Sequence, residues 1–145
     1  MLFLHAMAVS PQMLTGRWKA ISNSLTNGTQ STEKEYLQLK KDGTFSIVLL
    51  VSVRKDDAFI RDLKIEASGI WKVKDDVLVF VVKRVGVPVA KEVYLISKAS
   101  LQNLAHIFES RFTNDPIRII RIKNIGGAHF VTLNEESKET VYKRQ

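Results

Sequence analysis

Polar and apolar residues alternate most regularly in the segment 59–74, from Lys64 onward. One face of this segment carries Ile65, Ala67, Gly69, Trp71 and Val73. The positions between them are mostly charged or polar, and this period of two predicts a β-strand with one face toward the interior. The pattern places Trp71 inside, and Gly69 is a position at which the strand can bend.

Short apolar or alternating segments separated by turn residues recur along the whole chain. The other predicted strands are residues 16–23, 33–41, 45–53, 77–85, 89–97, 105–112, 117–124, 128–133 and 138–144. Asp42-Gly43 is the clearest hairpin turn, residues 24–32 read as a polar loop, and residues 100–104 as a single helical turn. No helical period persists long enough to supply crossover helices. About ten short strands at this spacing favour an all-β sandwich or barrel.

The two ends of the chain favour the barrel. Gly16 precedes Trp18 by two positions, so a residue without a Cβ lies close to a large ring. Arg144 near the C-terminus is the natural cationic partner for that indole, and such a contact contributes roughly 0.5–2 kcal/mol. First and last strands become neighbours only if the sheet closes. We therefore expect Gly16, Trp18 and Arg144 to form a clamp that closes the barrel.

These motifs resemble a known family. Gly16-Arg17-Trp18, Asp42-Gly43-Thr44-Phe45, Gly69-Ile70-Trp71 and a basic residue after a C-terminal aromatic resemble the lipocalin-like (calycin) barrels. The chain is most similar to the small bacterial lipocalin-like domains, over roughly residues 13–144. The resemblance implies a closed antiparallel up-and-down β-barrel of about eight to ten strands with an apolar interior.

The interior of this predicted barrel is the candidate ligand site. The inward candidates are Trp18, Phe45, Ile47, Leu49, Ile65, Trp71, Leu78, Phe80, Tyr94 and Tyr142. The leading hypothesis is a non-enzymatic barrel that binds a small hydrophobic or amphipathic molecule among them. The alternative is a filled core in a structural or interaction module of the bacterial envelope. Barrels of about eight strands lie at the border between filled and ligand-holding interiors, so the sequence leaves both open.

Two strands are apolar on both faces, namely residues 47–51 and 77–82. One face of each must be covered from outside the barrel, which suggests a homodimer, because monomers rarely expose large apolar patches. Both runs are far too short for a membrane-spanning helix.

Net charge is +7, and it is spread along the chain, with +3 in residues 1–72 and +4 in residues 73–145. The basic residues Arg118, Arg121 and Lys123, with Arg111 on the neighbouring predicted strand, are interpreted as a solvated outer face. Phe112 is the only aromatic residue near them, whereas single-strand nucleic-acid binders interleave aromatics with cations. A nucleic-acid-binding barrel is therefore the weaker alternative, and no nucleic acid is expected as a partner.

Candidate chemistry is sparse. The chain has no cysteine, which excludes disulfides and thiolate catalysis, and its three histidines, His5, His106 and His129, show no metal-ligand spacing. The adjacent carboxylate pairs at 56–57, 75–76 and 135–136 fall in predicted turns, where a solvated loop is the simpler reading. We expect no enzymatic activity, no metal and no cofactor.

The N-terminus suggests export. Residues 1–12 are separated from the domain at 13–145 by Pro11, and Leu2-Phe3-Leu4 followed by Ala6-Met7-Ala8 resembles the end of a secretory signal. A basic start is missing, so the hypothesis is a truncated export signal and a periplasmic or secreted protein. The alternatives are an apolar segment that covers one end of the barrel, and a cytoplasmic protein.

Overall fold

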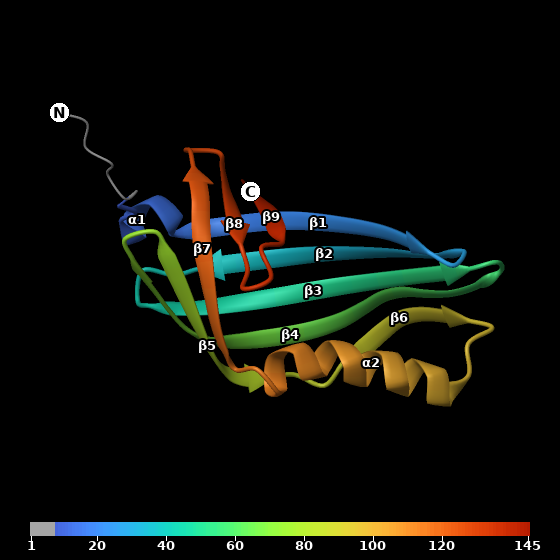
Figure 1. Ribbon diagram of the computed structural model, residues 1–145. Coiled ribbons are helices and arrows are strands. Elements are labelled where there is room, and N and C mark those ends of the chain that lie inside the picture. Colours follow the sequence, from blue (N-terminus) through green and yellow to red (C-terminus); the bar gives the residue numbers. More distant parts are fainter. Residues whose placement is uncertain (1–7) are drawn as a thin grey trace.

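A computed structural model describes residues 8–145 of the chain as a β-barrel with one helix along its side (Figure 1). The elements are α1 (Pro11–Leu14), β1 (Gly16–Thr26), β2 (Thr29–Leu39), β3 (Thr44–Lys55), β4 (Ala58–Lys74), β5 (Val77–Val85), β6 (Val89–Tyr94), α2 (Lys98–Thr113), β7 (Ile117–Ile125), β8 (His129–Leu133) and β9 (Glu139–Arg144). Most of the predicted export signal, including His5, falls on residues 1–7 and lies outside the described residues.

The barrel closes through two pairings. The sheet order β3-β2-β1-β9-β8-β7-β5-β4 returns on itself because β3 also pairs with β4, so eight antiparallel strands form a ring. Closure at the chain ends comes from β1 and β9, which pair at Trp18 with Arg144 and at Lys19 with Lys143. The predicted closed up-and-down barrel is confirmed.

The first four strands are longer than the barrel needs. β1 to β4 run side by side well beyond β7, β8 and β9 (Figure 1). We call this extension the wing, and it comprises residues 20–35 and 49–65. On β1 it begins after Lys19, the last residue that pairs with β9, and on β4 it ends before Ala67, the first residue that pairs with β5. β6 adds to the wing by pairing with β4 between Phe59 and Lys64.

The tip of the wing is a β-hairpin, where the sequence predicted a polar loop. Residues 24–32 are not a loop, because β1 and β2 pair without interruption from Gly16 with Leu39 to Thr26 with Thr29. Asn27 and Gly28 alone make the turn, both with positive φ (51° and 78°), as the tightest hairpins require.

The largest correction concerns residues 98–113. Residues 105–112 were predicted as a strand and residues 100–104 as one turn, but α2 spans both. Its N-cap is Ser97, whose hydroxyl accepts a hydrogen bond from the Ser100 main-chain nitrogen at 3.1 Å. Phe108 and Phe112 are buried against the core, and the helix packs on β4 and β5. It therefore covers the wing where the barrel opens.

Tyr94 was wrongly predicted to face the barrel interior. It is the last residue of β6, is 52% exposed, and stacks on Phe59 with ring centroids 5.7 Å apart. The reason is topological, because β6 joins the edge of the wing instead of the barrel wall.

The segment before β1 belongs to the core. Val9 and Leu14 are buried, and the Val9 nitrogen donates a hydrogen bond to the Asp75 carbonyl at 2.8 Å. Residues 9–14 thus cover the end of the barrel at which β1 begins.

Candidate functional site

One end of the barrel is closed by Arg144. Its guanidinium carbon lies 4.1 Å from the centre of the Trp18 ring. Its nitrogens donate hydrogen bonds to the carbonyl oxygens of Met13 (3.1 Å), Thr15 (3.0 Å) and Gly127 (2.8 Å). These three carbonyls come from segments at opposite ends of the chain, so one side chain joins them.

Gly16 leaves room for this guanidinium. A Cβ atom at position 16 would lie 2.5 Å from an Arg144 nitrogen, and the φ of Gly16 is +137°, which other residues rarely adopt. Trp18 is fully buried beneath, and its indole nitrogen donates to the Leu14 carbonyl at 2.7 Å. The structure thus brings together the three residues predicted for the clamp.

The interior above the clamp is filled. Nine of the ten predicted inward residues are at most 7% exposed: Trp18, Phe45, Ile47, Leu49, Ile65, Trp71, Leu78, Phe80 and Tyr142. Phe130 packs edge-on to Trp18 at 4.6 Å and stacks on Tyr142 at 4.8 Å, and Phe45 meets Phe80 at 4.9 Å. Aromatic rings therefore occupy this half of the barrel.

The other end is open. A pocket of about 720 Å³ lies where the wing leaves the barrel. It is lined by Ala20, Ile21, Ser22, Glu33, Glu35, Leu49, Arg111, Asp115, Arg118, Ile119, Ile120, Thr132, Asn134, Glu135, Glu136, Lys138, Glu139, Thr140, Val141 and Tyr142. We call it the open-end pocket. Of the predicted interior residues, only Leu49 and Tyr142 line it.

Three polar side chains from different strands meet in the open-end pocket. Glu35 on β2 accepts a short hydrogen bond from the Tyr142 hydroxyl on β9. Arg118 on β7 interacts electrostatically with both groups. Its guanidinium lies 4.5 Å from the Phe112 ring centre and donates to the Arg111 carbonyl at 2.6 Å. The C-terminal turn of α2 therefore fixes the position of Arg118.

A second arginine ties the helix to the wing. Arg111 pairs with Glu33 on β2 at 2.7 Å, and its guanidinium lies 4.4 Å from the centre of the Phe108 ring. This pair forms the rim of the open-end pocket on the side of α2.

Burial perturbs these groups. It raises the pKa of Glu35 above its ordinary 4.5, and the Tyr142 hydrogen bond and the Arg118 charge offset only part of the rise. The pKa of Tyr142 is raised well above 10 by burial and by the adjacent carboxylate. Burial likewise lowers the pKa of Arg118. Perturbed titratable groups that converge in a pocket are typical of functional sites.

The charge of the open-end pocket opposes that of the protein. The lining has six carboxylates, Glu33, Glu35, Asp115, Glu135, Glu136 and Glu139, and three cationic side chains, Arg111, Arg118 and Lys138. The chain as a whole carries +7. The pocket is thus an acidic region of a basic protein.

The open-end pocket also has a side opening. β1 and β9 pair at two positions only and then separate. Both strands line the pocket past that point, with residues 20–22 on one side and 139–142 on the other. A ligand can therefore approach both along the barrel axis and between these strands.

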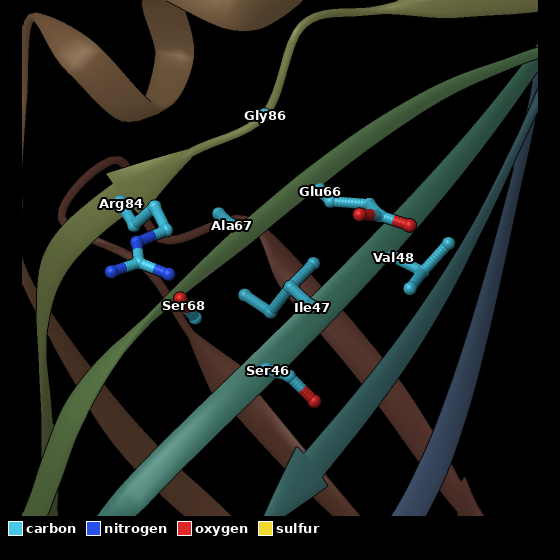
Figure 2. Close-up of a pocket in the computed structure, with 8 residues that line it drawn as sticks. All are labelled: Ser46, Ile47, Val48, Glu66, Ala67, Ser68, Arg84 and Gly86. Atoms are coloured by element: carbon cyan, nitrogen blue, oxygen red, sulfur yellow. The ribbon is translucent and has the colours of Figure 1, made fainter.

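A second, smaller depression of about 300 Å³ lies where β5 ends beside β3 and β4. Figure 2 shows Arg84 and Glu66 on opposite sides of it, with Ser68 on β4 and Ser46 on β3. Glu66 forms an ion pair with Lys64 at 3.1 Å. This depression has less than half the volume of the open-end pocket and no buried titratable pair, so we do not assign it the principal role.

The basic residues that the sequence grouped together are divided, because Arg111 and Arg118 line the open-end pocket and Arg121 and Lys123 do not. Arg118 faces the open-end pocket, whereas Arg121 and Lys123 are exposed and pair with Asp76 (3.6 Å) and Glu139. Residues 118 and 121 differ in parity, and in a strand this alone places them on opposite faces. The odd spacing between residues 118 and 121 was therefore the signal that could have identified Arg118 as inward-facing. For Glu35 the signal was its even spacing from Leu37, a core residue on the same face of β2.

The described residues contain no grouping of three acidic or histidine side chains able to hold a metal ion. Within residues 8–145, neither helix has the length and apolar character needed to cross a bilayer. The sequence matches no known protein-family model and no curated protein. The functional assignment therefore depends on the barrel and the open-end pocket.

Proposed function

We propose that this protein is a non-enzymatic, lipocalin-like binding protein that holds a small amphipathic molecule in the open-end pocket. The closed eight-stranded barrel is compatible with the lipocalin-like fold. The observation that carries the proposal is the meeting of Glu35, Tyr142 and Arg118 in a pocket of about 720 Å³ above an aromatic floor. Titratable groups with perturbed pKa values that converge in a concave pocket are the usual mark of a binding site.

The walls suggest how such a ligand lies. Ala20, Leu49 and Ile120 supply apolar surface, and Glu35 and Tyr142 supply the polar groups. The filled half below leaves no room for the ligand, so its apolar portion lies within the open-end pocket or in the side opening between β1 and β9.

Charge selects the head group. Six lining carboxylates against three cations favour a cationic head over an anionic one of the same size. A ligand ammonium near Glu35 would also compensate the cost of burying that carboxylate, which is the main cause of its raised pKa.

Isothermal titration calorimetry with three probes of equal chain length tests the proposal. Decylammonium, 1-decanol and decanoate differ only in the head group. We expect decylammonium to bind with one-to-one stoichiometry and at least about tenfold more tightly than decanoate, a difference of about 1.4 kcal/mol. Glu35→Gln should remove most of this preference.

Glu92→Gln is the matched control, because Glu92 lies on β6, outside the open-end pocket, in an exposed pair with Arg61. It should leave all three affinities unchanged. If none of the probes binds, the binding function is wrong. If they bind equally well, the pocket stands and the charge preference is wrong.

A further inference from the structure

One edge of the wing is unpaired. Beyond Lys19, β1 has β2 on one side, and among residues 8–145 no strand pairs with its other side. Residues 20–26 therefore present a row of main-chain donors and acceptors beyond the last pair with β9, along the part of β1 that extends into the wing (Figure 1).

This edge lacks the usual protection. Its sequence, Ala-Ile-Ser-Asn-Ser-Leu-Thr, contains no charge and no proline. Natural proteins commonly guard exposed edges with lysine, proline or inward-pointing charges. The opposite edge of the wing follows that rule, because β6 is preceded by Pro88 and contains Lys91 and Glu92. The contrast marks the β1 edge as a surface that pairs.

The edge is complementary to a second copy of itself. We propose that two copies pair antiparallel through β1 about a two-fold axis at Asn23, which makes one sheet continuous through both wings. This register places Ile21 opposite Leu25 of the partner copy, and Ser22 opposite Ser24. Ile21 and Leu25 are 55% and 69% exposed in the single chain, and they are the only large apolar side chains of the edge.

The charge distribution also favours residues 20–26 as the interface between two copies. Two chains of charge +7 repel each other over most of their surfaces. Residues 20–26 are uncharged, and a two-fold interface must be self-complementary, which a patch of one sign is not. The outer faces of β3 and β5, from which the sequence suggested a dimer, are only half-exposed at Val48, Leu50 and Val79. The exposed edge of β1 is thus the better candidate for the interface.

A charge-swap experiment tests the register. Asn23 would face Asn23 of the partner copy, so Asn23→Lys or Asn23→Asp places like charges directly opposite each other, which is destabilising in antiparallel sheets. By sedimentation velocity, the unaltered chain should be a dimer at about 100 μM, and each variant should dimerise at least about tenfold more weakly. An equimolar mixture of the two variants should restore the dimer, as a heterodimer.

A cross-linking experiment is independent of those variants. The chain has no cysteine, and opposed residues in antiparallel strands have Cα atoms about 4.5–5.5 Å apart, within disulfide range. Asn23→Cys should form an intermolecular disulfide under mild oxidation. Thr32→Cys is the control, because Thr32 lies opposite Asn23 but one strand inward on β2, and it should not cross-link.

The proposal is overturned if the unaltered chain sediments as a monomer at that concentration and Asn23→Cys does not cross-link. It is equally overturned if a dimer forms but persists in both Asn23→Lys and Asn23→Asp, because another surface then makes it. Circular dichroism of the variants separates either result from unfolding. Ala20, Ile21 and Ser22 belong both to this edge and to the lining of the open-end pocket, so sedimentation and cross-linking are carried out without ligand. Their outcome is then distinct from that of the calorimetry.

Discussion

Arg144 acts through the shape of its guanidinium as well as its charge. Three carbonyl oxygens from residues 13, 15 and 127 accept hydrogen bonds from one plane of donors, and the Trp18 ring lies against the face of that plane. A lysine has one nitrogen and no planar face, so it cannot meet both requirements.

Arg144→Lys should therefore destabilise the protein although it keeps the charge. We expect a loss of about 1–3 kcal/mol in the free energy of unfolding, from the hydrogen bonds and the cation–π contact of a largely exposed side chain. Urea unfolding followed by tryptophan fluorescence measures it. Lys143→Ala, one residue away, should stay within about 0.5 kcal/mol, and an equal loss in the two variants would contradict the clamp.

Glu35 makes the free energy of unfolding depend on pH. Below pH 4.5 its carboxyl is protonated in both the folded and the unfolded chain, so burial adds no electrostatic cost. As pH rises through its raised pKa, the folded state must hold a desolvated charge, whereas the unfolded chain ionises freely in water. The stability that this group contributes is therefore lost as pH rises.

The unfolding free energy of the natural chain minus that of Glu35→Gln should accordingly fall as the pH rises above 4.5, the ordinary pKa of a glutamate. Denaturant titrations at increasing pH measure the difference. A difference that increases with pH would mean that Tyr142 and Arg118 together lower the pKa of Glu35 below its ordinary value, and the account of this site would be wrong.

At the scale of elements, β4 is the strand on which barrel and wing divide. Its first half pairs with β6 and its second half with β5, and the pairing with β5 shifts register between Ser68 and Gly69. At this irregularity β4 and β5 approach each other closely. A Cβ atom on Gly69 would lie 1.9 Å from the Val81 carbonyl oxygen. The glycine that the alternation marked as a bend is a point of contact between β4 and β5.

Gly69→Ala should thus cost more than about 3 kcal/mol, or prevent folding, because main chain and not a flexible side chain obstructs the methyl group. Thermal unfolding by circular dichroism is the measurement. Gly127→Ala is the control, since no atom lies within 4 Å of a Cβ placed there. A tolerated Gly69→Ala would show that β4 and β5 can separate at this bulge.

The helix shows why part of this architecture was missed. Leu101, Leu104, Ala105, Phe108 and Phe112 repeat with helical spacing, and the segment has few β-branched residues. Alternation in residues 117–124 and the turn at Asn114 instead favoured a hairpin. When a short segment fits both the helical and the strand period, its tertiary contacts determine which structure forms. Here the segment packs as a helix on β4 and β5.

At the scale of the molecule, the barrel was predictable because its closure depends on residues with distinctive chemistry at both ends of the chain. A tryptophan near one end and an arginine near the other meet only in a closed sheet. The open-end pocket was not predictable, because Glu35, Arg118 and Tyr142 are adjacent only through three separate strand registers. A change of one residue in any register would turn that side chain outward.

Filled and open interiors coexist in this barrel. The sequence left a choice between a cavity and a packed core, and the molecule has a packed half beside the clamp and a pocket beside the wing. We propose that the ligand binds in the open half and that the aromatic half supports it.

Titration of decylammonium followed by amide and indole NMR tests this division of the barrel. We expect saturable shifts in residues 20–22, 33–35, 118–120 and 139–142, and no shift of the Trp71 indole, which is bonded to the Lys40 carbonyl at the closed end. Shifts that gather around Trp71 or along β6, or no saturable shift at all, would contradict it.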